Sequence, residues 1–170
     1  MLGSGARRPN PRISVKNAVF AKIVVGFDKA EFTIHQDLLT HHSPFFRAAL
    51  TGKFEESETK EVVLADTKPE IVEFFVHWLY YGRFPEDRDD AALVDLWTCD
   101  DEKGSRKKTR NLIRLYIFCD KYDVPQLRHT VMDELYSVMT FRAGRLPDPS
   151  ITSEAFEKLP DESGMCPVRY

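Results

Sequence analysis

The 170-residue sequence lacks any apolar run approaching the roughly 20 residues that a membrane-spanning helix requires. Its N-terminus also lacks the apolar core of a secretory signal. Cysteine is scarce: Cys99, Cys119 and Cys166 are odd in number and show no CxxC spacing. This pattern excludes a disulfide framework and favours a reduced environment. These absences predict an intracellular protein, cytoplasmic, nuclear or both, that does not associate with a membrane.

A basic excess is also missing. The formal net charge is −3 and the sequence pI is about 6.0, whereas general nucleic-acid binders need many Lys and Arg residues for phosphate contacts. The composition therefore argues against nucleic acid as a partner.

Motifs for catalysis or metal binding are equally scarce, since neither HExxH nor GxSxG spacing occurs. His41 and His42 are adjacent, so on a helix they would point about 100° apart and could not easily share one metal. His35 is either a catalytic base or, as we prefer, a capping or packing residue. His77 and His129 are expected at surface or rim positions of helices, and Cys119 as inert packing in an apolar helix. We predict no enzyme, catalytic residue, metal site, cofactor or small-molecule substrate.

Aromatic residues are abundant, with 12 Phe, 6 Tyr and 2 Trp, which is ample for the core of one domain. Residues 1–17 are rich in Gly, Pro and Arg and are expected to be a flexible tail. Residues 19–25 and 31–34, separated by a turn at Gly26, predict a β-hairpin. Residues 61–64 predict a third strand after a polar stretch.

Start and stop signals predict the helices. Ser43-Pro44 is an N-cap followed by proline at the first helical position, and Gly52 can end that helix. Thr67 and Glu70 have the spacing of a capping box for a central apolar helix that Gly82 ends. A short helix is expected at 35–39, a buried helix at 112–118, another that Asp123 caps, and a short one at 153–159.

Residues 85–110 interrupt this pattern, with acidic residues first and then a basic cluster from Lys103 to Arg110. A short helix is expected at 91–97, and the remainder as a loop. The basic cluster is either a nuclear-import signal or nucleic-acid contact, or, as we prefer, a solvated loop balanced by the preceding acids. Trp97 is either packed onto the domain or an exposed interface anchor.

Four segments in register resemble the BTB/POZ domain family. They are Phe32–Phe46, with Phe-x-x-His leading to Leu-Leu and Ser-x-x-Phe, then Glu61–Leu64, Phe75–Gly82 and Leu115–Leu127. The resemblance spans about residues 19–139 and implies an α+β fold: a small three-stranded sheet with a cluster of five or more helices. The positions that carry this signature are Phe32, His35, Leu38, Leu39, Ser43, Phe46, Tyr81, Gly82 and Tyr122.

The resemblance implies a domain at 18–140 with an insertion at about 85–110 and a C-terminal extension at 141–170. Phe20 or Ala21 and Gln36 stand where many members form a charged groove, and residues 1–17 lack an amphipathic helix for swapped dimers. The chain looks similar to single-domain fungal BTB proteins, whose tails often contain an acidic-aromatic stretch like Glu154-Ala155-Phe156.

The function that the resemblance implies is protein–protein interaction, as an adaptor or scaffold that recruits a cullin-type ubiquitin ligase. Members that serve cullins present an apolar-x-acidic triplet after the central helix, and two triplets qualify: Phe84-Pro85-Glu86 and Leu93-Val94-Asp95. With Trp97, the candidate partner-binding residues are Phe84, Glu86, Leu93 and Asp95. The alternative is a self-associating regulator linked to transcription or chromatin.

Overall fold

The fold begins with a β-hairpin, β1 (Phe20–Val25) and β2 (Ala30–His35), as the sequence predicts. The computed structural model describes residues 11–98 and 105–140. The two strands pair antiparallel from Phe20 opposite His35 to Val25 opposite Ala30. Gly26 has a φ of 68°, a left-handed conformation that glycine adopts without steric cost, and this permits the turn.

The third strand, β3 (Glu61–Leu64), lies parallel to β1 with Lys22 opposite Glu61 and Val25 opposite Leu64. The strand order is β2-β1-β3, so the described sheet is mixed and β3 forms one of its edges. A parallel pair needs a long crossover connection. Here β2 provides the return strand, and three helices complete the connection.

These helices are α1 (Gln36–His42), α2 (Pro44–Thr51) and α3 (Glu55–Thr59). The predicted cap of α2 is confirmed: Ser43 Oγ accepts a hydrogen bond from the Phe46 N–H at 3.0 Å. The helix ends before Gly52, also as predicted. The polar stretch before β3 is not merely a crossing segment, because its glutamates form the short helix α3.

The central helix, α4 (Pro69–Tyr81), ends at Gly82, whose φ of 69° confirms the predicted stop. The predicted capping box is wrong. Lys68 occupies the N-cap position without a side-chain hydrogen bond. The Thr67 hydroxyl instead hydrogen-bonds with Tyr122 Oη at 3.0 Å. The hydroxyl that the capping box would have used therefore binds a residue distant in the sequence.

The remaining helices are α5 (Ala91–Thr98), α6 (Ser105–Lys121) and α7 (Pro125–Thr140). The expectation of a loop up to residue 110 is wrong, since α6 begins at Ser105. The predicted cap at Asp123 is also wrong: Asp123 has a φ of 47° in the turn after α6, and Val124 precedes the first residue of α7. The predicted helix at 153–159, most of the N-terminal tail, Cys99 and Cys166 lie outside the described residues.

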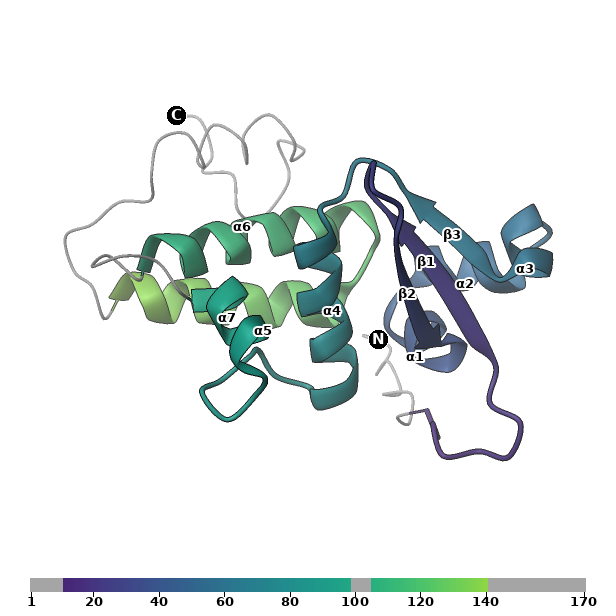
Figure 1. Ribbon diagram of the computed structural model, residues 1–170, viewed down its shortest axis with the longest axis horizontal. Helices are drawn as coiled ribbons and strands as arrows, with labels where there is room; N and C mark the ends of the chain where they lie inside the picture. The colour runs from purple at the N-terminus through teal and green to yellow at the C-terminus, as the bar shows by residue number, and fades with distance from the viewer. Residues whose placement is uncertain (1–10, 99–104, 141–170) are drawn as a thin grey trace, which may run out of the picture.

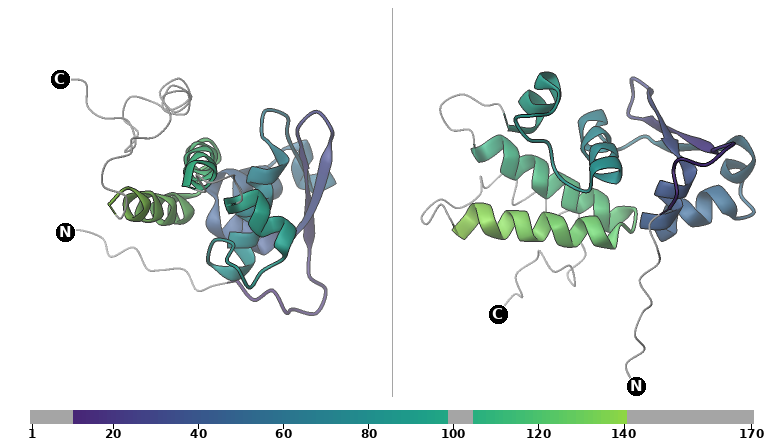
Figure 2. Two further views of the ribbon diagram at one scale, coloured as in Figure 1. Left: turned by 60° about the vertical axis from the view of Figure 1, so that its left-hand side comes forward. Right: turned by 90° about the horizontal axis from the view of Figure 1, so that it is seen from below.

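The elements are arranged with the sheet at one end and the antiparallel pair α6–α7 at the other (Figure 1). Helix α4 lies between them, and α1 and α2 lie against the sheet (Figures 1 and 2). Four aromatic rings join these layers. Phe46 of α2 lies 6.0 Å from both Phe75 and Tyr122, and Phe118 lies 5.0 Å from Phe75 and 4.7 Å from Tyr122. This aromatic cluster connects α2, α4 and the end of α6 through one core.

Ser43 should contribute strongly to stability because its buried hydroxyl joins two elements. It caps α2 and also donates to the Tyr122 carbonyl at 2.7 Å. Ser43→Ala removes both bonds and leaves a buried acceptor unsatisfied, so we expect a loss of about 1–3 kcal/mol of unfolding free energy in urea titrations. Thr51→Ala is the matched control, because the Thr51 hydroxyl is an exposed donor within the same helix. An equal loss in both variants would contradict the tertiary role of Ser43.

Candidate functional site

The Arg83–Asp89 ion pair holds the loop between α4 and α5. Arg83 donates two hydrogen bonds to the Asp89 carboxylate, at 2.6 and 2.7 Å, and the Glu86 N–H donates to the same carboxylate at 2.8 Å. The hydrogen bonds from Arg83, followed by that from the Glu86 backbone, hold the pKa of Asp89 well below its usual range. Bidentate pairs of this kind specify geometry as well as charge, so the loop has a defined shape.

Trp97 is packed rather than exposed. Its side chain is 1% exposed and lies between Phe84, stacked at 5.1 Å, and Phe74, edge-on at 4.7 Å. Asn111 of α6 donates to the carbonyls of Leu96 and Trp97 at 2.9 and 3.1 Å. Of the two alternatives for Trp97, the structure therefore has the packed one. Packed in this way, Trp97 holds α5 against Phe74 of α4.

The other predicted partner-binding residues lie around this anchor. Glu86 and Asp95 are exposed, whereas Phe84 and Leu93 are half-buried and packed against the core. Leu96, which sequence reasoning missed, is 39% exposed beside the buried Trp97. We call the surface formed by Phe84, Glu86, Leu93, Asp95 and Leu96 the α4–α5 face. It offers carboxylates beside partly accessible apolar groups.

His77 is buried beneath this loop, at 7% exposure, so its predicted surface position is wrong. Its Nε2 lies 3.8 Å from Asp89 Oδ2 and has no hydrogen-bond partner. Burial lowers the pKa of His77, an effect that the nearby Asp89 carboxylate opposes. The imidazole ring also packs on Tyr81 at 4.6 Å, so we assign it a packing role. His129 is exposed, as predicted.

The residues that carry the sequence signature are mostly structural. His35 Nδ1 hydrogen-bonds with Tyr80 Oη at 2.7 Å, and its ring lies 4.4 Å from Phe20. This is the packing role we preferred for His35. Phe32 is half-buried against the core, and Tyr81 is 64% exposed beside Gly82. The fully or nearly fully buried members are Leu38, Leu39, Ser43, Phe46 and Tyr122.

The structure also locates the candidate reactive groups. Cys119 is 1% exposed in α6, and burial raises the pKa of its thiol. The rings of His41 and His42 lie 4.6 Å apart, and His42 also packs edge-on against Trp78 at 5.0 Å. Among the residues that the structure describes, no group of three or more His, Cys, Asp or Glu side chains could hold a metal ion. None of the described helices has the length and apolarity to cross a membrane.

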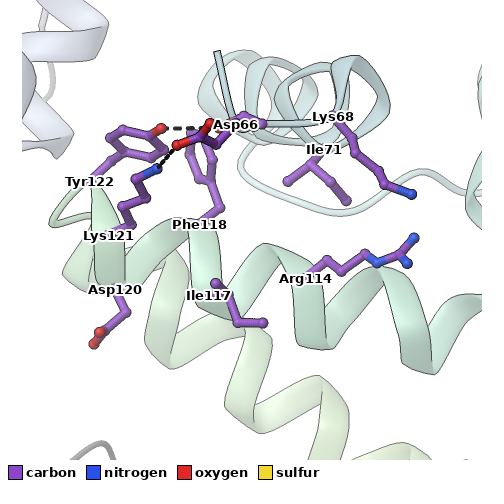
Figure 3. Close-up of a pocket in the computed structure, with 10 residues that line it drawn as sticks. Asp66, Lys68, Ile71, Arg114, Ile117, Phe118, Asp120, Lys121 and Tyr122 are labelled. Atoms are coloured by element: carbon purple, nitrogen blue, oxygen red, sulfur yellow. Dashed lines mark hydrogen bonds and ion pairs between the residues drawn. The ribbon is translucent and has the colours of Figure 1, made fainter. Parts of the chain in front are cut away.

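A groove of about 540 Å³ lies between the start of α4 and the last turns of α6 (Figure 3). Ile71, Ile117 and Phe118 form its apolar side. Lys121 Nζ lies 3.6 Å from the Asp66 carboxylate, with which it forms an ion pair, and Asp120 points away from the groove (Figure 3). The lining therefore combines charged groups of both signs with apolar groups.

The described part of the basic cluster belongs to α6 and is engaged. Lys107 Nζ donates to the Asp95 carbonyl at 2.7 Å, and Lys108 pairs with Glu134 of α7 at 2.5 Å. The expectation of a loop balanced by the preceding acids is therefore wrong for these two residues. The carboxylate that pairs with Lys108 lies on α7, and Lys107 contacts the backbone of α5. The two lysines therefore connect α6 to both neighbouring helices.

Comparison with known proteins identifies one family. The model of the BTB/POZ domain matches residues 14–101. Human Kelch repeat and BTB domain-containing protein 4 is 25% identical over 127 residues, covering 68% of this chain and 24% of that protein. Arabidopsis thaliana BTB/POZ and MATH domain-containing protein 5 is 29% identical over 98 residues, covering 58% of this chain and 23% of that protein.

The chain thus spans about a quarter of the length of these relatives. Among solved structures, the BTB (Tramtrack and Bric a brac) domain of human Gigaxonin has a TM-score of 0.45 and 14% identity. That match covers 68% of this chain and 75% of the solved one.

Burial of His42 should make the stability of the fold depend on pH. Desolvation, assisted by the charge of His41, lowers the pKa of His42 from 6.5 to about 4. The unfolded chain therefore takes up a proton first as the pH falls. The free energy of unfolding should decrease from about pH 6.5 toward pH 4 and then level off with respect to this group.

His42→Gln should flatten this dependence in urea midpoints measured across that range, and the exposed His129→Gln is the control. A slope that His42→Gln leaves unchanged would show that other groups cause it.

Proposed function

The chain belongs to the BTB/POZ domain family, and on this basis we propose that it is an adaptor that binds a cullin-type scaffold of a ubiquitin ligase. Domains of this family are generally protein-interaction modules without enzymatic activity. The adaptor role requires a preformed surface outside the core, and the α4–α5 face meets that requirement.

The observation that carries the proposal is the anchoring of the α4–α5 face. Two interactions hold its backbone in place: the Arg83–Asp89 ion pair within the loop and the stacking of Trp97 of α5 on Phe84. Binding to a rigid surface costs little ordering entropy, which leaves more of the contact energy as affinity. Phe84 stacks on Trp97, and Leu93, one helical turn before Trp97, packs against the core.

We favour Phe84-Pro85-Glu86 for the apolar-x-acidic role, because it begins two residues after Gly82, at the end of α4. Phe84 is half-buried, Pro85 is buried and Glu86 is exposed. Glu86 lies 3.0 Å from Arg88 and 3.8 Å from Arg83, so a cationic partner group would share an existing charge network. Asp95 and Leu96 extend the same alternation of acid and apolar group along α5.

Self-association is the second candidate, and a separate surface favours it. Four apolar side chains leading into β1 are exposed by 37% to 51%: Ile13, Val15, Val19 and Phe20. The β2 edge of the described sheet lies beside them, since Phe20 pairs with His35. Apolar groups gathered next to a free strand edge are suited to burial against a second copy.

Charge reversal on the α4–α5 face tests the first candidate. The Glu86→Lys/Asp95→Lys double variant changes two exposed carboxylates while sparing the buried support. We expect it to weaken binding to a cullin N-terminal domain by about tenfold or more in calorimetry. Asp28→Lys, an exposed acid in the β1–β2 turn, is the matched control and should bind as the parent does. Failure of the parent chain to bind any cullin N-terminal domain would contradict the proposal.

For the second candidate, light scattering should show a mass that rises with concentration toward that of a dimer. Val15→Lys/Val19→Lys should return the mass to that of one chain, because it places charge on the apolar surface. A constant monomer mass for the parent chain would exclude this candidate.

A further inference from the structure

The free edge of β3 forms a second exposed surface, on elements that the α4–α5 face does not include. Strand β3 pairs only with β1 in the described sheet. The carbonyls of Lys60 and Leu64 accept hydrogen bonds from the N–H groups of Lys22 in β1 and of Gly26 just after it, at 2.7 and 3.1 Å. In a strand, alternate residues direct their backbone groups to opposite sides. The Glu61 and Val63 backbones therefore face away from β1.

Only part of this outer edge is satisfied locally. The Glu61 N–H has a long contact, 3.4 Å, with Thr59 Oγ1. The Glu61 carbonyl and both backbone groups of Val63 are oriented toward a position where an added strand would pair. An extended segment gains main-chain hydrogen bonds at such an edge, while its alternate side chains enter adjacent pockets.

A groove of about 670 Å³ lies beside this edge, between β3, α2 and α3. Its apolar lining includes Ala48 and Ala49, with Phe45, Phe54 and Val63 exposed by 39%, 60% and 63%. Three large apolar side chains around one concave surface can receive the apolar side chain of an extended segment.

The charge of the groove determines which segment fits. Glu55, Glu56 and Glu61 line it, and no lysine or arginine does. Two cations near this edge are already engaged: Lys60 donates to the Leu50 carbonyl at 2.9 Å, and Lys22 lies 3.3 Å from Glu31 and 3.8 Å from Glu61. A second copy of this chain would bring carboxylates against carboxylates here, whereas Lys or Arg would neutralise them.

We propose that the edge of β3 and the adjoining groove bind an extended segment of a partner protein, with an apolar anchor flanked by Lys or Arg. The segment adds a strand beside β3, its anchor enters between Phe45 and Phe54, and its cations meet Glu55 and Glu56, since Glu61 already lies beside Lys22. This surface is independent of the cullin proposal, because the two surfaces share no residue.

A synthetic peptide tests this directly. The probe alternates valine and phenylalanine in its centre, carries arginine at both ends, and is titrated into the full chain with fluorescence anisotropy as the readout. We expect saturable binding that Glu55→Lys/Glu56→Lys weakens by about tenfold. Glu58→Lys, an exposed acid on the same helix that does not line the groove, should weaken binding less than threefold or so.

A backbone-methylated form of the peptide separates strand addition from simple charge attraction. Methyl groups on alternate amides block pairing with Glu61 and Val63, and this peptide should not bind. Slower amide exchange at Val63 on addition of the unmodified peptide would support the proposal. Equal binding of both peptides, or equal losses in the Glu58 and Glu55/Glu56 variants, would overturn it.

A peptide-free dimer that Glu55→Lys/Glu56→Lys dissociates would also overturn it, by assigning the groove to a second copy. The stability of each variant is checked by thermal unfolding, so a loss of binding is interpreted only for folded chains.

Discussion

The contact of α2 with the α6–α7 turn is the constraint on which the rest of the structure depends. The Ser43 hydroxyl caps α2 and donates to the Tyr122 carbonyl, while the Phe46 ring packs against Tyr122. Phe75 and Phe118 extend the same aromatic cluster into α4 and α6. Because one cluster touches three helices from distant parts of the chain, the sheet with α1 and α2 forms one core with the helical pair.

This arrangement separates support from recognition. Trp97, the largest fully buried side chain, lies in the core, where its contacts with Phe74 and Phe84 hold α5 in place. The groups left outside are carboxylates and smaller apolar side chains, on the α4–α5 face and along the β3 edge. Interfaces commonly place a few apolar anchors within a polar rim. The two faces lie on different elements and share no residue.

Much of the fold could be predicted from the sequence because its signals are local. The alternation around Gly26, the Ser43-Pro44 start and the Gly82 stop each depend on a few adjacent residues. Two of the failures share one cause, which is a partner distant in sequence. Thr67 has the spacing of a capping box, yet its hydroxyl pairs with Tyr122. The basic residues near Lys108 resembled a loop, yet Glu134 engages them on a helix.

The candidate site shows the same division. By itself, the sequence determined the order of the strands and of the described helices other than α3, the family resemblance, and the positions of the two triplets, because these follow from residue type and spacing. Only the tertiary structure decided that Trp97 is packed, that His77 lies under the loop beside Asp89, and that β3 leaves an edge beside an acidic groove. Those facts depend on which surfaces meet, and a side chain becomes buried or exposed only when distant segments pack.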